Sequence, residues 1–122
     1  MAYTAITVIE TAKGGVRFDN IGDNGVAGGA GTGYKFSNDG NVLIYIDNTA
    51  GNTPSMVVLA SGLFQGVALT TDNQTITPEA NADYIAGPFP RDIFNDADGN
   101  ARLYFSGGNE TELTITPFKR AG

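Results

Sequence analysis

Short apolar runs separated by closely spaced turn signals are the feature that most limits how this chain can fold. Asn, Asp and Gly, which tolerate tight-turn conformations, recur between runs rich in Val, Ile, Thr, Tyr and Phe. Turns spaced about every 8–12 residues are typical of a β-sandwich. The 122 residues predict a single domain spanning 1–122. We expect an all-β fold, an antiparallel Ig-like or jelly-roll-like sandwich of about eight short strands, with a small closed barrel as second choice.

The strand predictions in the first two thirds of the chain follow from apolar content. Val42–Asp47 and Ser55–Ala60 are apolar on both faces, which is typical of central strands, and we expect them to form an antiparallel pair. Thr4–Ile9 is predicted as a first strand. Val67–Thr70 and Gln74–Thr77 are predicted as two short strands about the turn between them.

The last predicted hairpin alternates apolar and polar residues. Asp98-Gly99-Asn100 signals a turn before the strand over 101–106. The second strand spans 112–118, and Pro117 places it at an edge of the sheet or marks its end. The residues predicted to face the core are Leu103, Phe105, Leu113 and Ile115, and those predicted to face outward are Arg102, Tyr104, Ser106, Thr114 and Thr116.

Gly87-Pro-Phe-Pro90 predicts a rigid corner near the end of the chain. The two prolines fix φ and remove two backbone donors, so no regular strand or helix continues through them. The residue before each proline is pushed out of the α region. Phe89 and Phe94 are too apolar for an idle surface loop, and one helical turn is predicted within 93–96. We expect this corner to pass from one sheet to the other and to close the end of the core.

Residues 11–33 form a glycine-rich tract with little side-chain volume. It is predicted to be a long loop or arm, either mobile or ordered against a partner. A second loop, 61–66, carries two apolar residues at its tip. The candidate partner-binding residues from these two segments are Val26, Ala27, Ala30, Thr32, Leu63 and Phe64.

The sequence offers few groups for catalysis. It contains no Cys and no His, which excludes a disulfide framework, thiolate chemistry and the usual nucleophile–histidine arrangements. Glu79, Asp83 and Asp92 are the candidate paired carboxylates, and we interpret them as solvated groups in turns. We therefore predict no enzyme activity, no catalytic residues and no cofactor.

Asp96-Ala-Asp-Gly-Asn100 resembles the start of a calcium loop because Asp96, Asp98 and Asn100 alternate. The remainder of such a loop is missing, because Gly99 lies two positions early and Gly107 stands where a bidentate Glu is expected. The segment is interpreted as a hairpin turn, and no metal site is predicted.

The charge balance argues against nucleic acid as a partner. Seven basic and thirteen acidic residues give a net charge of −6, which phosphate backbones repel. The sequence has no run approaching the ~20 apolar residues of a membrane span. The N-terminal residues lack the pattern of a signal peptide, so we expect no membrane association and no passage through a secretory pathway.

Two strings of residues resemble a known family. Phe36-Ser-Asn-Asp-Gly, followed by the apolar strand and Asn48, is similar to a signature of small tailed-phage virion proteins. Gly87-Pro-Phe-Pro with Phe94-Asn-Asp96 is similar to the C-terminal half of the same family. The resemblance covers about Gly33–Phe118, and the glycine tract departs from the family's pattern, which leaves the mode of attachment open.

This resemblance implies a β-sandwich head decoration, or capsid cement, protein. Such a protein is non-enzymatic, binds the major capsid protein on the outer surface of the capsid, and decorates or stabilises it. The expected location is the virion, assembled in the host cytoplasm, and a homotrimer would suit three-fold positions of a capsid.

Two alternatives remain open from the sequence. One is a tail or head–tail connector component of the virion. The other is a carbohydrate-binding β-sandwich module, which predicts that Tyr34, Tyr45 or Tyr104 lie exposed on one face.

Overall fold

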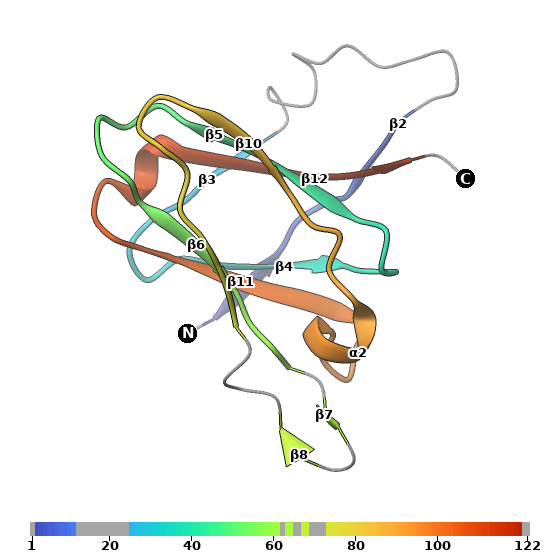
Figure 1. The fold of residues 1–122 in the computed structure, drawn as a ribbon. Helices are drawn as coiled ribbons and strands as arrows, with labels where there is room; N and C mark the ends of the chain where they lie inside the picture. The colour runs from blue at the N-terminus through green and yellow to red at the C-terminus, as the bar shows by residue number, and fades with distance from the viewer. Residues whose placement is uncertain (1, 12–24, 62, 65–66, 69–72, 121–122) are drawn as a thin grey trace.

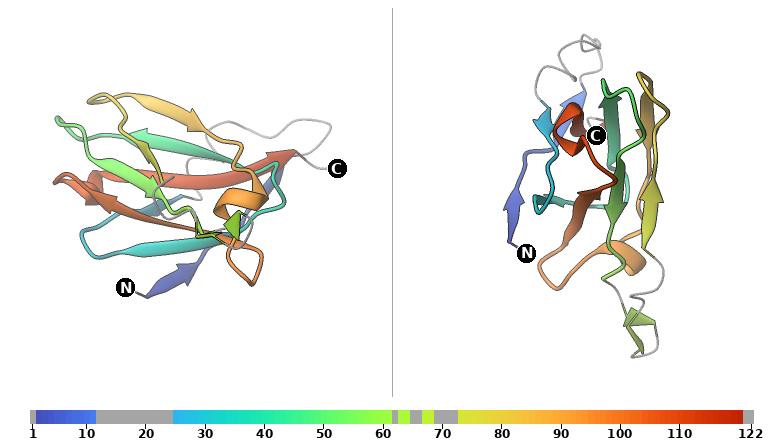
Figure 2. Two further views of the ribbon diagram at one scale, coloured as in Figure 1. Left: turned by 60° about the horizontal axis from the view of Figure 1, so that its bottom comes forward. Right: turned by 90° about the vertical axis from the view of Figure 1, so that its left-hand side faces the viewer.

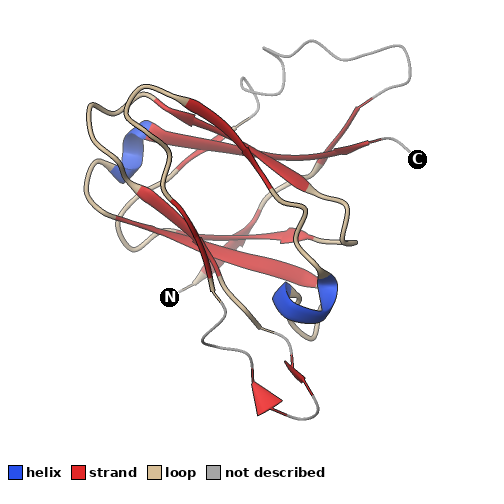
Figure 3. Ribbon diagram, viewed as in Figure 1, coloured by secondary structure: helices blue, strands red, loops and turns tan. Residues whose placement is uncertain are grey.

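Two five-stranded sheets that face each other form the body of the protein (Figure 1). The computed structural model describes residues 2–11, 25–61, 63–64, 67–68 and 73–120. Strands dominate these residues, with one short α-helix and one 3-10 helix between them (Figure 3). The all-β, sandwich-like fold expected from the turn spacing is therefore confirmed.

Each sheet combines strands from distant parts of the chain. The first sheet has the order β1 (Tyr3–Ala5), β4 (Gly33–Ser37), β11 (Asn100–Ser106), β6 (Ser55–Val58), β9 (Gln74–Ile76). The second has the order β10 (Asp83–Ala86), β5 (Leu43–Asn48), β12 (Leu113–Arg120), β2 (Ile9–Thr11), with β3 (Val26–Ala27) also paired to β12. The remaining elements are β7 (Leu63–Phe64), β8 (Val67–Ala68), helix α2 (Arg91–Phe94) and the 3-10 helix η1 (Glu110–Glu112).

The first predicted strand is wrong, because it divides between the two sheets. β1 pairs in parallel with β4, whereas β2 pairs in parallel with β12. Ile6 lies at the crossing, where its N–H donates to the Lys35 carbonyl at 2.9 Å, and its side chain and that of Val8 pack against the core. The sheets are therefore mixed rather than purely antiparallel.

The predicted antiparallel pairing of β5 with β6 is also wrong. β5 lies between β10 and β12 in the second sheet, and β6 lies between β11 and β9 in the first. The connection crosses from one sheet to the other, and the buried Asn48 side chain holds it by hydrogen bonds. Its Nδ2 donates to the carbonyls of Asn52 (3.1 Å) and Glu79 (3.0 Å), and its Oδ1 accepts the Ala50 N–H at 3.0 Å.

The two short strands expected about residues 71–73 do not pair with each other. β8 pairs with β7 in a separate hairpin, and β9 pairs with β6 at the edge of the first sheet. The β7–β8 hairpin lies beyond α2 at one end of the molecule (Figure 2). Residues 69–72 of the prediction lie outside the described part of the chain.

The core lies between the facing sides of the two sheets. The hairpin predicted from 101–106 and 112–118 is wrong, because β11 lies in the first sheet and β12 in the second. The predicted inward residues of these two strands are confirmed, since Leu103, Phe105, Leu113 and Ile115 are all buried. Thr116 was expected to be exposed but is 1% exposed. Thr116 is on the outer face, as predicted, but neighbouring residues cover it there. Tyr45 is its cross-strand partner, and Gly25 lies so close that a Cβ added to it would be 2.7 Å from Thr116 Oγ1.

Pro117 lies inside a sheet rather than at its edge. A proline is tolerated at this position because no neighbouring strand needs a hydrogen bond from its nitrogen. The Leu113 carbonyl accepts from Gly28 at 2.7 Å, so it points away from β5. Backbone groups alternate along a strand, so the Pro117 nitrogen also points away from β5. On that side β3 pairs with 114–115 and β2 with 118–120, and Pro117 falls in the gap between them.

The corner at 87–90 has the predicted role. Phe89 is 3% exposed and packs edge-on against Phe36 and Phe94, with ring centroids 6.2 and 5.6 Å apart. Gly87 has φ +107°, and a Cβ there would come within 3.0 Å of both the Phe89 ring and the Val42 carbonyl oxygen. The position therefore favours glycine. The single helical turn, α2, begins directly after Pro90, two residues before the predicted start.

Candidate functional site

A groove of about 430 Å³ runs along one open side of the sandwich, between β9 and β10. Gln74 and Ile76 line it from β9, because their partners Val58 and Met56 place them on the inward face of the first sheet. The corner, including Phe89, closes one end of the groove. Most residues that line the groove are apolar. It is bounded by two strands that form the ends of their sheets in the described part of the chain.

Ile85 gives this side of the molecule an exposed apolar side chain. Its side chain is 57% exposed, and among the described residues it is the one large hydrophobic residue that is exposed. Ile85 also lines the groove. It lies opposite Tyr45, so both side chains occupy the outer face of the second sheet.

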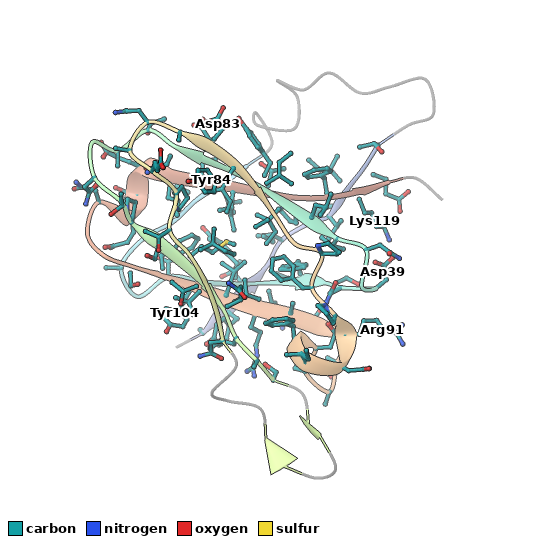
Figure 4. The ribbon with its side chains drawn as sticks, in the orientation of Figure 1. Asp39, Asp83, Tyr84, Arg91, Tyr104 and Lys119 are labelled. Carbon is teal, nitrogen blue, oxygen red and sulfur yellow. The ribbon has the colours of Figure 1, made fainter. Side chains whose placement is uncertain are left out.

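Two carboxylates lie side by side on the same outer face. Asp83 is directly opposite Asp47, and the Asn48 N–H donates to the Ala82 carbonyl. Residues 48 and 82 are thus a hydrogen-bonded pair, so Asp47 and Asp83 form the closer, non-hydrogen-bonded pair. Like charges in direct opposition are destabilising in a sheet, which makes this pair a candidate site for a cationic group. Figure 4 labels one member of the pair, Asp83 on β10.

The surroundings of this pair shift two pKa values. Burial, followed by hydrogen bonding and repulsion from Asp83, raises the pKa of Asp47 above its ordinary value of 3.8. The Tyr45 hydroxyl donates to Asp83 Oδ2 at 3.1 Å. Burial and the Asp83 carboxylate raise the pKa of Tyr45 to about 12. Tyr45 therefore stays neutral and acts as a hydrogen-bond donor rather than a base.

Asp83 is located differently from the sequence-based interpretation. We expected it in a turn with Glu79 and Asp92, but it belongs to strand β10. Glu79 is exposed in a connection, as predicted, whereas Asp92 is exposed but lies in helix α2 rather than in a turn. The role of Ile85 and the opposition of Asp47 and Asp83 were missed, because they depend on which strands become neighbours. Residues 83–86 show no clean alternation of polar and apolar side chains that could have signalled the strand.

The glycine-tract candidates lie on the body of the sandwich rather than on a free arm. Val26 and Ala27 form β3 and pair with Ile115 and Thr114, and the Tyr34 hydroxyl donates to the Ala27 carbonyl at 2.7 Å. Residues 28 and 29 are buried. The expected loop is therefore ordered over 25–32, while 12–24 lie outside the described residues.

The six candidate partner-binding residues do not form one surface. Ala30 is exposed and Thr32 half-buried, both just after β3. Leu63 and Phe64 form β7, which lies near α2 and well apart from β3 (Figure 1). The predicted exposure of Leu63 and Phe64 stays a prediction, because the structure does not describe these two side chains. Val26 also lines a second groove, of about 390 Å³, where β1 continues into β2.

The residues proposed for sugar stacking do not align. Tyr34 faces inward and packs edge-on against Phe105 at 6.0 Å. Tyr104 lies on the outer face of the first sheet, whereas Tyr45 lies on the outer face of the second. A shared aromatic platform is therefore not formed by these three.

Asp96 organises a hairpin turn, as its sequence pattern suggested. Its Oδ1 accepts the N–H groups of Asp98 (2.9 Å) and Asn100 (3.0 Å). Among residues 2–11, 25–61, 63–64, 67–68 and 73–120, no group of three or more acidic, His or Cys side chains is placed to hold a metal ion.

Within the same described residues, no helix is long and apolar enough to cross a membrane. Comparison with protein-family models, with curated proteins and with solved structures gives no match. The functional interpretation therefore depends on the geometry and on the two family-like strings of residues.

Proposed function

We propose that the protein is a non-enzymatic structural component of a tailed-phage virion, which binds the outer surface of the capsid and decorates or stabilises it. Its partner in this proposal is the major capsid protein, and its location is the capsid surface after assembly in the host cytoplasm. We also propose that the sandwich is of the Ig-like or jelly-roll-like type.

One observation carries the proposal: the two family-like strings of residues meet in space. The Asn38 Nδ2 group donates to the Phe89 carbonyl at 2.9 Å and to Asn95 Oδ1 at 2.7 Å. Phe36 from the first string packs against Phe89 from the second. The resemblance therefore lies in residues that fix the fold, as expected if it reflects a shared framework rather than chance turns.

The remaining support comes from the surface. A decoration protein requires a rigid scaffold and surfaces that contact other subunits. The sandwich supplies the scaffold, and the groove beside β10 with the exposed Ile85 supplies an apolar contact surface.

Co-sedimentation tests the proposal directly. The purified chain is mixed with empty capsids assembled from the major capsid protein of the same phage, and the pelleted amount is measured against a capsid-free control. We expect saturable binding and a higher capsid disassembly temperature, because a ligand that binds the assembled state stabilises it. Absence of both binding and thermal shift would rule out decoration.

Two further measurements define the mode of binding. Electron microscopy of the decorated particle locates the protein, and density at the portal or tail would instead support the connector alternative. Sedimentation equilibrium of the free chain distinguishes a monomer from the homotrimer that would suit three-fold positions.

A further inference from the structure

We propose that the open edge of β10 accepts an extended segment of a partner protein as an added strand, with a Lys or Arg side chain opposite Asp83. Three features of this edge favour strand addition: the backbone of β10, its side chains and the groove beside it.

The backbone of β10 presents hydrogen-bonding groups to the outside. The Asn48 N–H donates to the Ala82 carbonyl at 3.1 Å, and the register pairs Tyr84 with Ile46. Even-numbered residues of β10 therefore bond to β5, and Asp83 and Ile85 direct their N–H and C=O groups away from it. In the described part of the chain no strand pairs with that side, so it can pair with an added strand.

The side chains specify the chemistry of the added strand. A residue opposite Asp83 would extend the row Asp47–Asp83 on the outer face. A cationic side chain there neutralises the repulsion between the two carboxylates, whereas an acidic one increases it. Two positions along, a residue opposite Ile85 would extend the row Tyr45–Ile85 and so favours an apolar side chain.

The groove receives the intervening side chains. Residues of an added strand that alternate with the outward ones would face the inward side of β10, toward Ile76, Phe89 and Phe94. These walls are apolar, so Val or Ile is the expected residue. The partner segment therefore alternates a basic and an apolar outward residue with β-branched inward residues.

Three synthetic peptides test the inference. The first is acetylated Ser-Val-Lys-Val-Ile-Val-Ser amide, whose Lys and Ile lie opposite Asp83 and Ile85 when it adds parallel to β10. The second replaces its Lys by Glu, and the third is the Lys peptide N-methylated at the residues that would bond to β10 in that orientation. Binding is followed by chemical-shift changes in the ¹H–¹⁵N spectrum of the full chain. We expect the Lys peptide to shift the amides of Asp83 and Ile85 and to bind at least ~10-fold more tightly than either control.

Charge reversal provides the matched variants. Asp83→Lys should invert the preference, so that the Glu peptide binds more tightly than the Lys peptide. Asp92→Lys makes the same change in net charge at an exposed residue of α2 and should leave the preference intact. If Asp83→Lys does not fold, Asp83→Asn should still reduce the Lys-to-Glu ratio.

Several outcomes would overturn the inference. These are equal binding of the Lys and Glu peptides, full binding of the N-methylated peptide, or shifts that map elsewhere. Concentration-dependent dimerisation of the free chain that Ile85→Lys abolishes would show instead that a second copy occupies the edge.

Discussion

Asn38 and Asn95, which are 57 positions apart in the sequence, exchange two hydrogen bonds through their amides. Asn38 Nδ2 donates to Asn95 Oδ1 at 2.7 Å, and Asn95 Nδ2 donates to the Asn38 carbonyl at 2.8 Å. Asn38 also accepts the Gly40 N–H at 3.1 Å. The pair thereby joins the turn before β5 to the end of α2, and it holds the corner against the core.

Replacing Asn38 by Ala should destabilise the protein by about 2–4 kcal/mol. The side chain is buried, and its loss removes the hydrogen bonds that it makes to the Phe89 carbonyl, Asn95 Oδ1 and the Gly40 N–H, each at a cost of about 1–3 kcal/mol before relaxation. Urea unfolding measures the change. Asn41→Ala, at an exposed neighbouring position, should cost less than about 0.5 kcal/mol. Equal costs for the two variants would contradict the role given to Asn38.

Phe89→Ala should cost about 3–5 kcal/mol, because it removes a buried ring and leaves a cavity between Phe36 and Phe94. Thermal and urea unfolding measure the loss. Ile85→Ala is the control, since that side chain is 57% exposed and its truncation should have a much smaller effect. A loss below about 1 kcal/mol for Phe89→Ala would place the ring outside the core.

Gly28→Ala should destabilise by about 1–3 kcal/mol through overpacking. A Cβ at Gly28 would lie 2.6 Å from the Glu110 carbonyl oxygen and 2.8 Å from the Phe105 ring, so backbone must move. Gly51→Ala, with no atom within 4 Å of its Cβ, is the matched control and should be nearly neutral. Similar unfolding midpoints for both variants would mean that β3 is not held against the sandwich.

Asp47→Asn should stabilise the protein at about pH 7 by less than about 1 kcal/mol, because Asp47 is only half-buried and solvent screens the repulsion. The pKa of Asp47 is raised in the folded state. From 3.8 upward the folded state therefore binds more protons than the unfolded state, and stability falls as pH rises through the folded pKa. Below 3.8 the carboxyl is protonated in both states, and the gain should vanish.

Urea unfolding of both proteins at about pH 3 and pH 7 measures this difference, with Asp92→Asn as a control at an exposed residue. A gain for Asp47→Asn that does not change with pH would exclude charge repulsion from Asp83 as its cause.

The sequence predicted those strands that have a clear apolar pattern of their own. It did not predict which strands lie side by side, because that depends on residues far apart in the chain. Alternation placed Leu103 and Phe105 in the core, and the prolines marked the corner. β5 and β6 were expected to pair because both segments are rich in apolar residues, as central strands are. Their connection instead crosses from one sheet to the other, and hydrogen bonds of the Asn48 side chain hold it. The apolar pattern of the sequence gives no sign of these hydrogen bonds. β4 and β10 are short strands without clean alternation, and they were not assigned.

The candidate site was also predictable only in its local features. An alternating strand fixes which face a side chain occupies, but not what covers that face. Thr116 was therefore assigned the correct face and the wrong exposure. Asp47 and Asp83 are far apart in the sequence, and their opposition arises only from the pairing of β10 with β5. A single sequence carries no signal for that pairing.

The parallel pairing of β2 with β12 has a mechanical consequence. Ile9 lies beside Phe118 and Thr11 beside Arg120, so tension between the two ends of the chain pulls these strands past each other along their length. The hydrogen bonds between them then carry the load together, in shear, instead of opening one after another as in a hairpin pulled from its ends. Because the segment from β1 to β2 is also attached to the first sheet, the two sheets share that load.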